Sequence, residues 1–441
     1  MNLLNKLHTR LGDFWWYSLM LFLAARAADC LNVFVGLWLV PKYVEPSELG
    51  AVMPLTHFAN FLAIPIAVFA STFRNELSTL AVNRKFGQMK TLMRSVFITT
   101  AIFLFLAIVI CRIVLPAYLE RIRLAEGSLG ILILTAAFVS TVAPIYTNAL
   151  QSLKKLGANS LISLLGAPLR LLTMLATMPL RAVSGYFVGQ TATPAFSIVA
   201  SVVALRKELS VPAEPYWTRA VVKRLGRLFA IFAACSFASG FVLLVENMLI
   251  RQRLPDLDSA AYYMVTRFSD VAGFVSTAIC FTLFPFTAEL AARGKDLRPL
   301  VYKATLAIVT TNALLAAFLW IFGERLLLLL PHGHEYASYW WAMPWIVGIT
   351  TLGLIPGAYT TAQASAFRFG WIKWMVPINV LYPTLLLLVT GYGYFRGFLP
   401  SSWTDFLTTH NITCIKTMLW WMTGANALKA ICCAVQMRRA N

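Results

Sequence analysis

The 441-residue sequence is too apolar and too sparsely charged to be that of a soluble protein. Hydrophobic residues make up 59% of it and charged residues 12%, which is about half the charged fraction of a soluble domain. The net charge of +19 is large, but the basic residues lie in short segments between apolar runs, as in the positive-inside pattern of membrane proteins. The composition therefore excludes a nucleic-acid partner and favours a membrane protein.

Long apolar runs follow one another along the whole chain. A membrane span needs about 20 apolar residues, and the run 96–116 carries a single charge, Arg112. The connections between runs are too short to fold as domains. We therefore predict an all-α polytopic protein with about twelve transmembrane helices, at 14–40, 48–72, 93–116, 129–151, 158–180, 182–205, 228–250, 260–288, 304–330, 338–366, 369–395 and 415–437.

The distribution of Lys and Arg predicts how these helices cross the membrane. With the amino terminus inside, the inner segments hold 23 basic residues and the outer segments hold 10. Cytoplasmic segments are the ones enriched in Lys and Arg. We expect a multi-pass protein of the cell inner (plasma) membrane with both termini in the cytoplasm.

The second half of the chain repeats the first at an offset close to 212 residues. Four short blocks match in order, at offsets from 210 to 215, and the longest pairs Tyr146–Gly157 with Tyr359–Gly370. Two six-helix halves with the same orientation are related by a pseudo-two-fold axis along the membrane normal, which is a transporter architecture. We predict an amino-terminal lobe at 1–205, a basic cytoplasmic linker at 206–227 and a carboxy-terminal lobe at 228–441.

The sequence resembles the multidrug/oligosaccharidyl-lipid/polysaccharide exporter superfamily, and most of all its polysaccharide-transporter branch, which includes the Wzx-type flippases. The resemblance rests on the six-plus-six layout, the stretch Leu254–Tyr263, the block 265–294 and the turn Gln151–Gly157. It implies a cavity between two lobes that opens alternately to each side, and a polyprenyl-diphosphate-linked oligosaccharide as substrate. It also implies polysaccharide polymerase machinery as a partner. The superfamily's lipid-precursor flippases carry two additional carboxy-terminal helices; with about twelve helices expected here, we expect this protein to depart from that branch.

Ionisable residues inside the predicted spans are the candidates for a binding site. Each costs about 2.5–3.5 kcal/mol at a helix centre, so such residues usually face a cavity or a partner. Two pairs have the spacing RxxD, which places both side chains on one helix face. The candidates for a cationic cavity are Arg26, His57, Arg170 and Arg267, and those for charge pairing or ion coupling are Asp29, Glu246 and Asp270.

The cationic candidates favour an anionic substrate. Arg267 and His57, which is its repeat equivalent, lie roughly 11–14 Å from the outer ends of their helices, and Arg26 lies roughly 18 Å from the inner end of its helix. A ring of cations at similar depth suits a diphosphate, because the planar arginine fork grips two oxygens at once. The resemblance adds cavity arginines in the first and eighth helices, where Arg26 and Arg267 lie.

Structural roles stay open for the same residues. Each RxxD pair can be a self-satisfied salt bridge, and a carboxylate can also orient an arginine that binds phosphate. His57 can be a packed polar residue, and Arg170 can extend toward the interface or bond a neighbouring carbonyl. Glu246 lies close enough to the outer end of its helix, and to Arg251, to be interfacial.

The missing motifs narrow the function. There is no GxxxxGK[ST] loop, so this chain hydrolyses no ATP, and we expect no cofactor and no metal site. The preferred function is a flippase for a lipid-linked oligosaccharide that works by alternating access. One alternative is a cation-coupled drug or metabolite exporter of the same fold. Another is a membrane glycosyltransferase or polymerase, which the short outer loops disfavour; we expect no enzyme.

Overall fold

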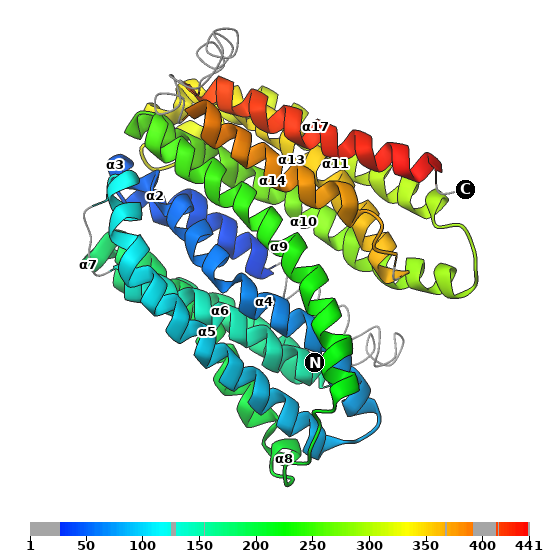
Figure 1. Ribbon diagram of the computed structural model, residues 1–441. Coiled ribbons are helices and arrows are strands. Elements are labelled where there is room, and N and C mark those ends of the chain that lie inside the picture. The colour runs from blue at the N-terminus through cyan, green and yellow to red at the C-terminus, as the bar shows by residue number, and fades with distance from the viewer. Residues whose placement is uncertain are drawn as a thin grey trace, which may run out of the picture. The chain divides into compact units, whose positions relative to one another are not determined.

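The computed structural model describes residues 27–124, 129–153, 155–366, 368–390, 412 and 414–439. Within these ranges every regular element is a helix (Figure 1). In chain order they are the π-helix η1 (Val35–Leu39), α2 (Val40–Tyr43), α3 (Pro46–Leu49), α4 (Val52–Val82), α5 (Phe86–Arg121), α6 (Leu129–Ser152), α7 (Leu156–Ala204), α8 (Arg206–Leu209), α9 (Arg219–Arg253), α10 (Asp256–Ala292), α11 (Arg298–Leu328), α12 (Gly333–Tyr336), the 3₁₀ turn η2 (Ala337–Tyr339), α13 (Ala342–Ser365), α14 (Ile372–Thr390) and α17 (Ile415–Arg439).

The protein is an all-α, multi-pass membrane protein. Among the described residues, nine helices are long and apolar enough to cross a bilayer. The predicted eighth span, 260–288, lies inside α10, and the predicted first span, 14–40, lies in part outside the described residues. Helix α9 begins at Arg219, nine residues before the predicted start of its span, because the basic turn that precedes the apolar run is also helical.

Helix α7 contains two of the predicted spans, joined by a sharp reversal. Arg181 has φ −149° and ψ 41°, and Ala182 has φ 23° and ψ −107°, so the helix breaks between the predicted spans 158–180 and 182–205. The two arms then pack on each other: Thr177 Oγ1 donates to the carbonyl of Gly185 at 2.9 Å. A Cβ on Gly189 would lie 2.1 Å from Cγ of Met174, so only glycine permits this approach.

The described chain forms two compact units. Unit 1 comprises residues 27–35 and 55–237, and unit 2 comprises residues 36–54 and 238–439. The segment 36–54 precedes most of unit 1 in sequence yet belongs to unit 2, and α9 contributes to both units. The lobe limits expected from the sequence, 1–205 and 228–441, stay a prediction.

Unit 1 is built around α4 to α7, and the predicted linker packs against it. The core includes Leu77 and Leu92, and α6 packs closely on α7. The non-helical residues after α8 lie along α5: Lys90 Nζ donates to the carbonyl of Val211 at 3.0 Å, and Thr91 Oγ1 to that of Glu214 at 2.6 Å. These bonds fix the linker to this unit.

Unit 2 is built around α10, α11, α13 and α17. Its core includes Leu283, Ile308, Ala358 and Cys433, and α13 packs against α10, α11 and α17. A buried hydrogen bond of 2.7 Å joins the hydroxyls of Thr287 on α10 and Ser365 on α13. Helix α14 lies against α17 at the side of this group. These helices position the polar side chains described next.

Candidate functional site: polar groups inside unit 2

Arg267 is the predicted cavity residue that the structure describes most fully. It lies on α10, and its Nη1 donates to Oδ2 of Asp270 at 3.0 Å, so this RxxD motif forms the ion pair that its spacing predicts. The guanidinium also lies 4.9 Å from the ring centroid of Tyr263. The side chain of Arg267 stays 24% exposed and that of Asp270 40% exposed. The pair therefore orients the arginine and leaves part of it accessible.

The segment 36–54 packs directly against this arginine. A Cβ added to Gly36, in η1, would lie 2.8 Å from Cδ of Arg267. Glycine at this position therefore lets the backbone of η1 approach the side chain of Arg267 closely. A larger residue there would force η1 or the side chain of Arg267 to shift.

The other predicted site residues lie elsewhere in the chain. Arg26 lies outside the described residues. Asp29, His57 and Arg170 are half-buried, each has an interaction partner, and all three belong to unit 1. Arg267 belongs to unit 2. The ring of cations therefore stays a prediction.

Glu246 is the most deeply buried carboxylate of the predicted set. It lies on α9 and is 3% exposed; its expected depth near the membrane interface stays a prediction. The hydroxyl of Tyr382, on α14, donates to its Oε1 at 2.8 Å. Lys429, a buried residue of α17, attracts it electrostatically. Three helices of unit 2 therefore converge on one carboxylate.

The contacts between α9 and α14 recur along both helices. Asn379 donates to Oγ of Ser239 at 3.2 Å, Tyr382 donates to Glu246, and Arg253 donates to the carbonyl of Thr390. The α9 members of these pairs are seven residues apart, which is the repeat that keeps one helix face against a neighbour. Polar groups thus line the seam between two parallel helices.

One buried acceptor in this seam has no hydrogen-bond donor among the described residues. The Oδ1 atom of Asn379 is buried and accepts no hydrogen bond from the described residues. Buried polar atoms are nearly always satisfied by protein or by ordered water. Asn379 Oδ1, one helical turn from Tyr382 on α14, is therefore an acceptor that the described residues leave unsatisfied.

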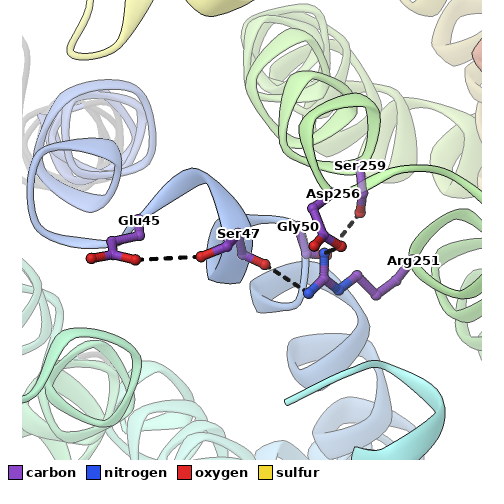
Figure 2. Close-up of polar contacts among 6 residues, drawn as sticks. All are labelled: Glu45, Ser47, Gly50, Arg251, Asp256 and Ser259. Atoms are coloured by element: carbon purple, nitrogen blue, oxygen red, sulfur yellow. Dashed lines mark hydrogen bonds and ion pairs between the residues drawn. The ribbon is translucent and has the colours of Figure 1, made fainter. Parts of the chain in front are cut away.

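Arg251 fixes the segment 36–54 onto unit 2, as Figure 2 shows. Its side chain is 1% exposed; Nη1 donates to Oδ1 of Asp256 at 2.8 Å and Nη2 to the carbonyl of Ser47 at 2.7 Å. Beside it, the hydroxyl of Ser259 donates to the carbonyl of Gly50 at 3.4 Å. A Cβ on Gly50 would lie 2.8 Å from that of Ser259, so α3 and α10 meet through a glycine.

Sequence reasoning overlooked most partners of the buried carboxylate. Lys429 was recognisable, because it is an ionisable residue inside a predicted span. Tyr382 and Asn379 had no such signal, since Tyr and Asn are common in spans and their role depends on the register of α14 against α9. Within the described ranges, no three His, Cys, Asp or Glu side chains gather as a metal site.

Comparisons with known proteins identify the fold. No protein-family model matches the sequence, and no curated protein sequence matches it significantly. Among solved structures, the inward-facing conformation of a multidrug resistance MATE family transporter of the MOP superfamily superposes with a TM-score of 0.66 at 12% identity, covering 93% of this chain and 94% of that one.

Two further structures agree. A single-residue mutant of the Vibrio cholerae MATE transporter VcmN superposes with a TM-score of 0.61 at 13% identity, covering 100% of this chain and 98% of that one. MATE in the straight conformation gives 0.60 at 14% identity, covering 96% and 94%. The chain therefore has the fold of the MATE transporters of the MOP superfamily along nearly its whole length.

Proposed function

We propose that this protein is a cation-coupled exporter of a small organic molecule that works by alternating access. The observation that carries the proposal is the buried carboxylate of Glu246, which accepts a hydrogen bond from Tyr382 and is attracted electrostatically by Lys429, inside a MATE fold. The solved structures with this fold include multidrug resistance transporters. This proposal gives more weight to the exporter alternative than to lipid flipping. We also propose that both termini are cytoplasmic.

The chemistry of Glu246 explains how coupling would arise. A carboxylate inside a span is costly unless its charge is compensated. In this site the compensation comes from the Tyr382 hydroxyl and the Lys429 ammonium, and a bound proton or Na⁺ would supply it instead. A cation that binds one arrangement of the helices more tightly than the other shifts their equilibrium by that difference in affinity. Glu246 is the proposed coupling residue.

Reconstitution tests this role directly. In proteoliposomes, an H⁺ or Na⁺ gradient should drive native protein to move a fluorescent organic cation in the opposite direction, without ATP. Glu246→Gln keeps the size of the side chain and its bond with Tyr382 but cannot carry the charge, so gradient-driven transport should fall to the level of protein-free liposomes. Substrate exchange without a gradient should persist.

Glu324→Gln is the matched control, because Glu324 is an exposed carboxylate on α11. It should transport at the native rate. Equal gradient-driven transport by native protein and by Glu246→Gln would contradict the coupling role. Failure of native protein to move any small organic cation or anion would contradict the exporter itself.

A second candidate function is the flipping of a lipid-linked oligosaccharide, with polysaccharide polymerase machinery as partner. The partly exposed guanidinium of Arg267, oriented by Asp270, favours it, because such a fork binds two diphosphate oxygens. A fluorescent polyprenyl-diphosphate oligosaccharide should then flip in proteoliposomes of native protein and not in those of Arg267→Ala. Arg267→Lys, which keeps the charge without the fork, should flip more slowly than native protein. Equal flipping by all three would contradict this candidate.

A further inference from the structure

The surface of unit 2 contains an apolar groove between α14 and α17. It has a volume of about 560 Å³, within the range of sites that hold small molecules. Its walls are almost entirely hydrocarbon, and Tyr382 and Thr417 are the hydroxyl-bearing residues that line it. The other lining residues are Ile378, Leu381, Leu385, Trp420, Trp421, Gly424, Ala425 and Leu428.

The groove lies within two candidate membrane spans, 372–390 and 415–437. Its rim is exposed within unit 2: Leu381 is 60% exposed and Trp420 66%. Adjacent spans run antiparallel in the predicted topology, so Leu385, toward the carboxy-terminal end of α14, and Thr417, near the start of α17, lie at the same end of the groove. This is the outer end in the predicted topology. A hydrocarbon chain that lies parallel to these helices fits such a groove.

Cationic side chains lie at that same end. Lys416 immediately precedes Thr417, and its Nζ lies 5.1 Å from the ring centroid of Trp341. Trp341 contacts Trp345, which contacts Trp420 on the groove wall. Arg253 donates to the carbonyl of Thr390, the last residue of α14. Tryptophan beside Lys or Arg is typical of the level at which lipid headgroups lie.

We propose that the groove binds one anionic phospholipid of the outer leaflet. One acyl chain lies between α14 and α17 against Leu381, Trp420 and Gly424, and the phosphate lies beside Lys416 and Arg253. Apolar walls select the chain, and the two cations select the charge of the headgroup. Lipid binding is measured without transport, so the result does not depend on which substrate the protein moves.

Gly424 provides a specific way to fill the groove. It lines the groove, and a Cβ added to it meets no atom within 4 Å, so a large side chain enters open space. Gly348, on α13, is also open to a Cβ but does not line the groove. Gly424→Phe and Gly348→Phe therefore form a matched pair, in which each replaces a helical glycine and only the first occupies the groove.

The experiment uses the full-length protein with the photo-crosslinking residue benzoylphenylalanine in place of Trp420, in nanodiscs of phosphatidylglycerol and phosphatidylcholine. After illumination, mass spectrometry identifies what is attached at position 420. We expect phosphatidylglycerol adducts in preference to phosphatidylcholine adducts. Adding Gly424→Phe should lower the yield of phosphatidylglycerol adducts about tenfold, because the phenyl ring removes apolar contact between the acyl chain and the groove equal to about one side chain. Adding Gly348→Phe should leave the yield unchanged.

The headgroup is tested by Lys416→Gln in the same protein. Loss of one cation near the membrane surface should lower the preference for phosphatidylglycerol about fivefold. Equal adducts with both lipids, or equal yields from the two glycine variants, would overturn the proposal, because the contact would then be general bilayer contact. Attachment to residues 391–411 of the chain itself would overturn it as well, as would displacement of the phospholipid by equimolar polyprenyl phosphate.

Discussion

At the scale of single residues, unit 2 depends on charges that are held by specific partners. Arg251 satisfies both Asp256 and a backbone carbonyl from the segment 36–54. Arg267 is held by Asp270 and Tyr263, and Glu246 by Tyr382. A buried charge that keeps its partners is tolerated, whereas removal of one member leaves the other without compensation. Each contact therefore makes a separate prediction.

Replacement of Arg251 should destabilise unit 2. Arg251→Met keeps much of the apolar length of the side chain but leaves the Ser47 carbonyl without its donor, which costs about 1–3 kcal/mol. Asp256 is 45% exposed and regains water, so it adds little. The thermal unfolding midpoint in detergent should fall for Arg251→Met and hardly change for Gln252→Met, its half-buried neighbour. Equal midpoints would show that this contact does not hold the segment.

At the scale of elements, the ends of a helix are held together by a side chain that bonds residues far away in the sequence. Lys155, which precedes α7, donates to the carbonyl of Ala204 at 2.7 Å and pairs with Glu208 of α8 at 2.8 Å. This side chain joins both ends of the α7 hairpin. Burial raises the pKa of Glu208, but the hydrogen bond and charge of Lys155 outweigh burial, so the pKa of Glu208 lies below its usual value.

The lowered pKa predicts a pH-dependent contribution to stability. The ionised pair stabilises the fold above the usual pKa of Glu, about 4.3, and the contribution is lost as the pH falls through the lower folded pKa. Glu208→Gln should therefore lower the unfolding midpoint slightly at pH 7 and should match native protein at a pH below that folded pKa. Glu214→Gln serves as control, since Glu214 bonds to Thr91 through its backbone carbonyl, which the substitution keeps. A midpoint difference that is the same at both pH values would contradict this role.

Hydropathy predicted the spans well because a run of about 20 apolar residues leaves few alternatives inside a bilayer. The break in α7 was predicted for the same reason, since Arg181 interrupts two long runs. The assignment of residues 36–54 to unit 2 was not predicted, because it depends on the bonds of Arg251 and on the close approach of Gly50 to Ser259. The pairing of Glu246 with Tyr382 likewise depends on helix register, which composition does not encode.

At the scale of the whole molecule, the internal sequence repeat falls on elements in equivalent chain order. The block at Leu55–Phe58 lies on α4 of unit 1, and its counterpart Val265–Phe268 lies on α10 of unit 2. Tyr146 lies on α6, and its counterpart Tyr359 lies on α13. Two units built from the same order of elements are the parts that alternating access requires. The central claim is that these units change their arrangement during a transport cycle.

Double electron–electron resonance tests this claim most directly. Spin labels at exposed positions Glu120 and His334 report on the predicted outer ends of units 1 and 2, and labels at Lys85 and Lys295 report on the inner ends. In nanodiscs, lowering the pH or adding Na⁺ should change the two distance distributions in opposite senses, since one side opens as the other closes. Distances that stay unchanged, or that lengthen together, would contradict alternating access.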